Sequence, residues 1–165
     1  MIQNTIPFQP SRFASLRATT PVPVSWETIV NELTGPFHKV QTELYRQTIA
    51  RFHQAEQDND NLLLPKLKAE KEQIKQAQPA FIASVSLTGG RTSAHVTGYS
   101  GFIMVDVDDI PSGQFAETLA RVKTDPHTFL AHTTISGTGI RVFVRMEGTI
   151  TKGNFFLAWQ AVNEY

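Results

Sequence analysis

The spacing of apolar residues changes at Pro79, and this change restricts the possible folds more than any other feature of the sequence. Before Pro79, apolar residues recur at the spacing of amphipathic helices. After it, short apolar runs end in turn residues, which is typical of strands. The expected helices span 25–34, 37–58 and 66–78, and the expected strands span 80–87, 101–107, 128–135 and 140–146, with a crossover helix at 112–125. Helices followed by strands that enclose one crossover helix predict an α+β domain.

The length of 165 residues suits one domain with an appended arm, since a domain usually takes about 100–200 residues. Residues 1–24 contain Pro7, Pro10, Pro21 and Pro23, and proline fixes φ and removes a backbone donor, so we expect an extended arm or at best an edge strand. The domain is expected over 25–165, with a helical part at 25–78 and a strand-rich part at 79–165. Helical spacing continues to the last residue without a stop signal, which predicts the front part of a longer protein, truncated at its C-terminus.

The composition excludes several classes of function. The 15 Lys and Arg balance the 15 Asp and Glu, which removes the argument for a strongly basic nucleic-acid-binding surface but leaves room for a local basic patch. No cysteine is present, so disulfides and thiolate zinc sites are excluded. No apolar run approaches the ~20 residues that cross a bilayer, and no secretory pattern opens the chain. We expect a cytoplasmic protein with no membrane partner.

An acidic cluster ends the predicted strand 101–107. Side chains alternate along a strand, so Asp106 and Asp108 point to the same side, while Asp109 points away or begins a turn. Two carboxylates on one side repel each other unless a cation lies between them, and oxygen ligands suit Mg²⁺ or Mn²⁺. The alternative is an Asp-rich turn. That alternative suits Asp109, whereas Asp106 falls inside the apolar run.

Two glycine-rich loops that carry an arginine follow predicted strands. The first loop, 136–139, contains Ser136, Gly137 and Gly139 and leads to Arg141. The second loop, 88–91, contains two glycines and ends at Arg91. Glycines let backbone N–H groups approach an anion, and arginine adds a charged fork. Either loop alone is most often a simple hairpin or turn. Both loops together with the two aspartates resemble a site for a metal-bound nucleoside triphosphate, with Arg91 as a second phosphate contact.

These motifs resemble those of the VirE-type N-terminal domain family, within the primase–polymerase (archaeo-eukaryotic primase-like) superfamily found in bacterial mobile-element replication proteins. The resemblance covers about residues 67–146 and rests on 79–91, 101–108 and 136–142. It implies a mixed or antiparallel sheet with an RRM-like core behind N-terminal helices. It also implies catalytic metals on Asp106 and Asp108, and nucleotide phosphates on Ser136, Gly139 and Arg141. A helicase or DNA-binding region downstream is implied as well.

Two positions depart from that family pattern. Arg141 stands where many members have histidine, and arginine cannot exchange a proton at neutral pH. The third metal-binding carboxylate of the superfamily has no counterpart after Met146, where the acids are Glu147 and Glu164. A site short of one carboxylate should hold two metals poorly.

Three functions therefore remain open. The first is metal-dependent nucleotidyl transfer, with Asp106 and Asp108 on Mg²⁺ or Mn²⁺ and with Ser136, Gly137, Gly139, Arg141 and Arg91 on the triphosphate. The second is a non-catalytic module that binds a nucleotide, DNA or RNA. The third is a purely structural domain, in which the aspartates form a turn and the loops are hairpins.

Overall fold

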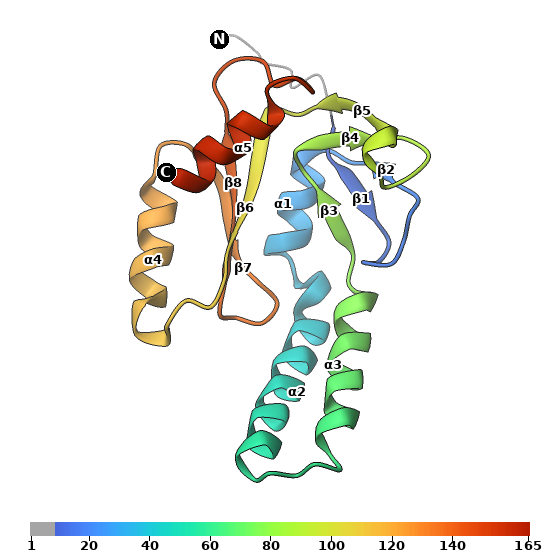
Figure 1. Ribbon diagram of the computed structural model, residues 1–165, viewed down its shortest axis with the longest axis vertical. Coiled ribbons are helices and arrows are strands. Elements are labelled where there is room, and N and C mark those ends of the chain that lie inside the picture. Colours follow the sequence, from blue (N-terminus) through green and yellow to red (C-terminus); the bar gives the residue numbers. More distant parts are fainter. Residues whose placement is uncertain (1–8) are drawn as a thin grey trace.

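The computed structural model describes residues 9–165, and its strands lie together while a hairpin of two helices projects from them (Figure 1). The α+β class is confirmed, because helices and antiparallel sheets alternate along the chain. None of the described helices is both long enough and apolar enough to cross a membrane.

The three helices predicted before Pro79 are present. Helix α1 spans Trp26–Thr34, α2 spans Lys39–Gln57 and α3 spans Leu64–Ala77. Ser25 caps α1 by accepting a hydrogen bond from the backbone N–H of Thr28, which satisfies one of the otherwise unpaired donors of a helix start. Helices α2 and α3 pack side by side as the projecting hairpin (Figure 1).

The main sheet is built from β6 (Phe102–Val107), β7 (Thr128–Thr133) and β8 (Ile140–Arg145). The strand order is β6-β8-β7, and β8 pairs antiparallel with both neighbours. Helix α4 (Ser112–Thr124) connects β6 to β7. The unit is therefore a split β-α-β arrangement, in which the returning strand inserts between the two parallel ones.

The two faces of the main sheet have different surroundings, because successive side chains alternate along each strand. One face packs on α4, where Ile140 and Val142 of β8 are buried together with Ile110. The opposite face carries Trp26 of α1, whose ring lies 4.6 Å from that of Phe102 and 5.6 Å from that of Phe143, centroid to centroid. This second face also carries Asp106 and Arg141.

The N-terminal segment is more than an arm or an edge strand. Strand β1 (Ser11–Phe13) lies between β2 (Val22–Pro23) and β3 (Ala80–Ile82) in a three-stranded sheet. The side chain of Phe13 is completely buried. The described prolines leave this strand intact. Pro10 precedes it, Pro21 lies in the connection to β2, and Pro23 lies in β2 at the sheet edge, where a missing N–H is tolerated. Pro7 lies outside the described residues.

The predicted strand 80–87 is divided into two. Its second half is β4 (Val85–Leu87), which pairs with β5 (Val96–Tyr99) in a separate two-stranded sheet. Short 3₁₀ helices η1 (Pro36–His38) and η2 (Ser93–His95) and the last helix α5 (Phe155–Glu164) complete the fold. Helix α5 contacts β6.

Candidate functional site

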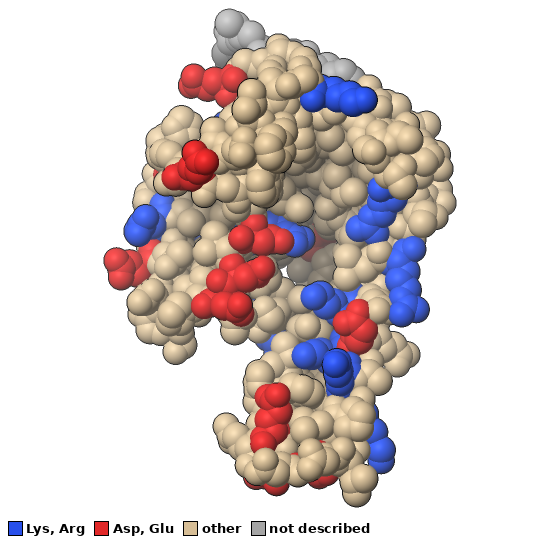
Figure 2. Space-filling model, viewed as in Figure 1, with Lys and Arg blue, Asp and Glu red and all other residues tan. Residues whose placement is uncertain are grey.

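A hollow of about 600 Å³ lies between the open face of the main sheet and the helices α2 and α3. Figure 2 shows it in the middle of the molecule, with acidic side chains gathered on one side and basic side chains on the side of the helical hairpin. The sheet contributes Asp106, His132, Arg141 and Phe143, and Asp108 follows directly after β6. The helices contribute Tyr45, Arg46 and Lys75. Ser136 of the loop between β7 and β8 also lines it.

Asp106 and Arg141 form the central ion pair of this hollow. They are register partners on β6 and β8. The Nε of Arg141 donates to Oδ1 of Asp106 at 2.6 Å, and Nη2 donates to Oδ2 at 2.7 Å. Hydrogen bonding by Arg141 lowers the pKa of Asp106 despite its partial burial, and the pKa of Arg141 is raised in turn. The pair is therefore charged at neutral pH, with both carboxylate oxygens engaged.

His132 lies on the other side of Arg141. It is the register partner of Arg141 on β7, and its Nδ1 lies 3.0 Å from the carbonyl oxygen of Thr133. Burial lowers the pKa of His132, and the positive charge of Arg141 acts in the same direction. His132 is therefore neutral at physiological pH.

Asp108 lies just beyond the end of β6 and differs from Asp106 in its contacts. Its carboxylate accepts no hydrogen bond from any described residue. A methyl group placed on Gly139 would lie 2.9 Å from Oδ1 of Asp108 and 2.9 Å from the carbonyl oxygen of Val107. The glycine thus allows the loop to approach the end of β6 closely.

The donor set for a metal ion is incomplete among residues 9–165. No group of three or more His, Asp or Glu side chains is arranged to hold a metal there. Asp106 and Asp108 share the hollow, as their spacing predicts, but Asp106 is already paired with a guanidinium group.

Three backbone N–H groups of the glycine loop, those of residues 137–139, are engaged within the loop. The N–H of Gly137 donates to the carbonyl oxygen of Thr134 at 3.0 Å, and the N–H of Gly139 donates to Oγ1 of Thr134 at 3.2 Å. Ser136 accepts at its Oγ from the N–H of Thr138 at 3.4 Å. The loop therefore contributes the wall of the hollow and the side chain of Ser136, rather than a row of unpaired amides.

Two basic residues of the site were missed by sequence reasoning. Arg46 of α2 donates from Nε to the carbonyl oxygen of Ile135 at 3.1 Å and from Nη2 to that of Thr134 at 3.4 Å. Lys75, near the end of α3, lines the same hollow. Neither belongs to a motif, and the mixed charges of residues 66–75 predict only a solvated helix face, so the sequence carries no signal for them.

Arg91 lies outside this site. Its Nη1 donates to the carbonyl oxygens of Leu16 and Ala18, and its guanidinium group lies 4.5 Å from the centre of the Phe13 ring. The structure thus gives Arg91 a role in holding the N-terminal segment against β4 and its loop. The two glycine-rich loops are not brought together at the hollow.

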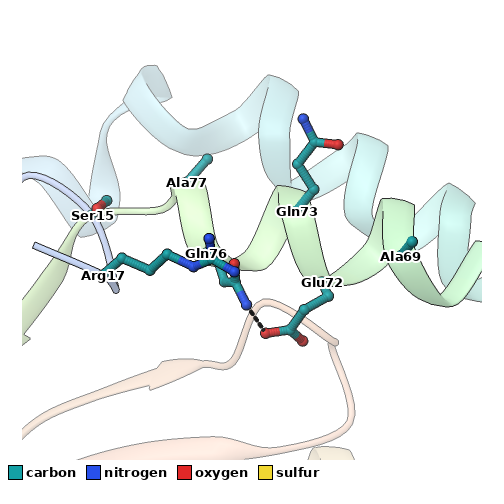
Figure 3. Close-up of a pocket in the computed structure, with 7 residues that line it drawn as sticks. All are labelled: Ser15, Arg17, Ala69, Glu72, Gln73, Gln76 and Ala77. Atoms are coloured by element: carbon teal, nitrogen blue, oxygen red, sulfur yellow. Dashed lines mark hydrogen bonds between the residues drawn. The ribbon is translucent and has the colours of Figure 1, made fainter.

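A second, shallower hollow lies on the outside of α3. Figure 3 shows Arg17 beside Glu72 and Gln76, which hydrogen-bond to each other. Two alanines, one serine and one further glutamine make up the rest of its lining. It lacks the convergent charges of the first hollow, which is therefore the candidate site.

Comparison with protein families identifies the chain. The model of the BT4734-like N-terminal domain matches residues 73–163, which is more than half of the 165 residues. The chain belongs to the BT4734-like N-terminal domain family. The expected VirE-type membership is wrong, since the matching family is a different one, and short motifs shared between families cannot distinguish them.

The BT4734-like stretch contains both aspartates, the glycine loop and Arg141, together with Lys75. Arg46 and Tyr45, on α2, lie before it. Comparison with the curated proteins and with the solved structures finds no match.

Proposed function

We propose that this domain is a nucleotide-binding module that holds the phosphates of its ligand between Arg141, Arg46 and Lys75. The observation that carries the proposal is the convergence of three basic side chains from β8, α2 and α3 in one hollow, in a chain whose net charge is zero. Arginine forks and lysine ammonium groups are the usual protein ligands of phosphate.

Each basic side chain retains an unused donor. Arg141 and Arg46 are both anchored through Nε and Nη2, and Nη1 of each makes no hydrogen bond to any described residue. The Nζ of Lys75, which lines the same hollow, likewise has no hydrogen-bond or salt-bridge partner among the described residues. Anchored guanidinium groups lose little freedom on binding, which favours affinity for an anion.

The other end of the hollow suits a nucleobase. Met104 and Phe143 are register partners that line it beside the Asp106–Arg141 pair. Two residues along a strand span about 7 Å, so a ligand with its phosphates at Arg141 reaches these apolar side chains with its sugar and base. Leu33 of α1 and Phe81 of β3 continue the apolar lining. An apolar wall beside convergent polar groups is typical of small-ligand sites.

A second candidate function is nucleotidyl transfer with Mg²⁺ or Mn²⁺. It is favoured by the presence of Asp106 and Asp108 in one hollow. A divalent cation there would neutralise phosphate charge and polarise the reacting phosphorus. This function requires Arg141 to release Asp106, and in the described residues no third carboxylate or histidine completes a metal site with these two.

Calorimetric titration of ATP and of GTP into the chain, in EDTA and in Mn²⁺, tests the proposal. We expect the unmodified chain to bind in EDTA. We expect Lys75→Gln to bind about tenfold or more weakly, because a hydrogen bond to a charged group is lost. Lys68→Gln is the matched control, since Lys68 is an exposed lysine of the same helix outside the hollow. The proposal fails if the folded chain binds neither nucleotide, or if both variants lose affinity equally.

The Mn²⁺ experiments separate the two candidates. Binding that persists in EDTA supports a module without a required metal. Binding only with Mn²⁺, together with release of pyrophosphate when a primed template is added, supports nucleotidyl transfer.

A further inference from the structure

We infer that Asp106 is a positioning residue, which orients Arg141 for the anion, and that its role differs from that of Asp108. The inference rests on the proposed function and deepens it. The sequence presents the two aspartates as an equivalent pair, because they share one face of a strand end. The structure distinguishes them by what each carboxylate contacts.

The contact of Asp106 engages both of its oxygens. Nε and Nη2 of Arg141 donate to Oδ1 and Oδ2 at 2.6 and 2.7 Å, which is the fork-to-fork geometry of the strongest arginine–carboxylate pairs. A metal ion on Asp106 would have to displace this guanidinium group. Fixing two nitrogens of Arg141 also fixes the direction of the third, Nη1, which has no described partner.

The position of the pair in the sheet makes the orientation specific. Asp106 and Arg141 are opposed across β6 and β8, and β8 is the central strand. His132 of β7 opposes Arg141 from the other side. Arg141 therefore has a neighbour on each side within the sheet. Asp106 is the neighbour that carries the opposite charge.

Arg46 shows the same arrangement with different acceptors. Its Nε and Nη2 are also held by the protein, at the carbonyl oxygens of Ile135 and Thr134, and its Nη1 is also without a described partner. Two guanidinium groups held through the same nitrogens in one hollow form an anion clamp. Asp106 accepts the hydrogen bonds from Nε and Nη2 of Arg141, and two backbone carbonyls accept the corresponding bonds of Arg46.

Asp108 has no such contact. Its carboxylate lines the hollow but accepts no hydrogen bond from the described residues. Its charge also acts on Arg141 through space, where it helps to raise the pKa of that side chain, while toward an anion it is a repelling charge. Substituting the two aspartates should therefore change anion affinity in opposite directions.

The test measures binding of ATP and of inorganic tripolyphosphate, in EDTA, to Asp106→Asn and Asp108→Asn. Each variant removes one negative charge from the hollow, so electrostatics alone predicts tighter binding in both. We expect Asp106→Asn to bind about tenfold or more weakly, because Arg141 loses its orientation. We expect Asp108→Asn to bind as tightly as the unmodified chain or more tightly.

A double substitution shows whether Asp106 acts through Arg141. In the Arg141→Gln background, Asp106→Asn should no longer weaken binding, whereas an independent structural role would weaken it in both backgrounds. Thermal melting checks that each variant folds. If Asp106→Asn does not fold, Asp106→Glu takes its place. It keeps the negative charge but moves the carboxylate oxygens away from Nε and Nη2 of Arg141, so it should also weaken binding, whereas electrostatics alone predicts no change.

The outcomes separate this inference from the proposed function. If the unmodified chain binds in EDTA and Asp106→Asn does not weaken that binding, the inference is wrong while the proposed function stands. If binding requires Mn²⁺ and both Asp→Asn variants abolish it, Asp106 is a metal ligand and the inference is wrong. If the folded chain binds neither probe in any condition, the proposed function fails and the inference fails with it.

Discussion

Asp106 and Arg141 face each other across β6 and β8, joined by two hydrogen bonds of 2.6 and 2.7 Å. About a third of each side chain remains exposed, at 34% for Asp106 and 35% for Arg141. The pair is thus open to the hollow rather than sealed in the core. The same contact occupies both carboxylate oxygens of Asp106, which a metal ion would need as ligands. It also holds the guanidinium group of Arg141 toward an anion.

The pH dependence of stability should report this pair. The pKa of Asp106 is lower in the folded chain than in the unfolded one, where a carboxyl of aspartate titrates near pH ~3.9. The pair therefore stabilises the fold above that pH, and the stabilisation is lost as the pH falls through the folded value. Urea unfolding from pH 7 to pH 2.5 should show a smaller acid-induced loss in Asp106→Asn.

Asp109→Asn is the control for this experiment. Asp109 adopts a positive φ of 53°, which asparagine tolerates, and its carboxylate accepts no hydrogen bond from the described residues. Its acid-induced loss should match that of the unmodified chain. If the free energy of unfolding fell equally with pH in all three proteins, the Asp106–Arg141 pair would not stabilise the fold.

Gly139→Ala should destabilise the domain. The added methyl group would lie 2.9 Å from the backbone oxygen of Val107 and 3.1 Å from Oγ1 of Thr134, so the loop must move away from β6. Overpacking of this kind costs about 1–3 kcal/mol. Gly113→Ala, in α4, is the matched control, because nothing lies within 4 Å of its added methyl group. Alanine also has a higher helix propensity than glycine, by up to about 1 kcal/mol inside a helix. Chemical denaturation should show a lower free energy of unfolding for Gly139→Ala and a higher one for Gly113→Ala.

Ser11→Ala should weaken the attachment of the N-terminal segment. Ser11 is buried, and its Oγ accepts a hydrogen bond of 2.9 Å from the backbone N–H of Leu87. Removing that acceptor leaves a buried donor unpaired, which costs about 1–3 kcal/mol. Ser93→Ala, at an exposed serine without a described side-chain partner, should change the free energy of unfolding by less than about 0.5 kcal/mol. A neutral Ser11→Ala would mean that β1 contributes little to the fold.

Arg46→Gln should loosen the loop between β7 and β8. Arg46 holds the carbonyl oxygens of Ile135 and Thr134 from α2, so its loss removes the link between the helical hairpin and this loop. We expect faster amide hydrogen exchange in residues 134–139. Arg51→Gln removes a mostly exposed salt bridge to Glu70 on the same hairpin and should leave that exchange unchanged. Unaltered exchange in Arg46→Gln would refute the link.

Much of the secondary structure follows from local signals. The helix that begins after Ser25 and the strand Phe102–Val107 lie close to where the sequence predicts them, because side-chain capping and apolar runs act over a few neighbouring residues. The small sheet around β1 was not predicted. Its partner β3 is nearly 70 residues away in the chain, and local patterns carry no information on such pairing.

The sequence by itself determined that Asp106 and Asp108 point to one side, because the alternation of side chains along a strand is a local property. It also determined the α+β class and the absence of any thiolate chemistry. Only the tertiary structure decided that Arg141 faces Asp106, that Arg46 and Lys75 reach the same hollow, and that Arg91 lies elsewhere. These relationships depend on strand order, register and helix packing, which bring together residues that no spacing in the chain connects.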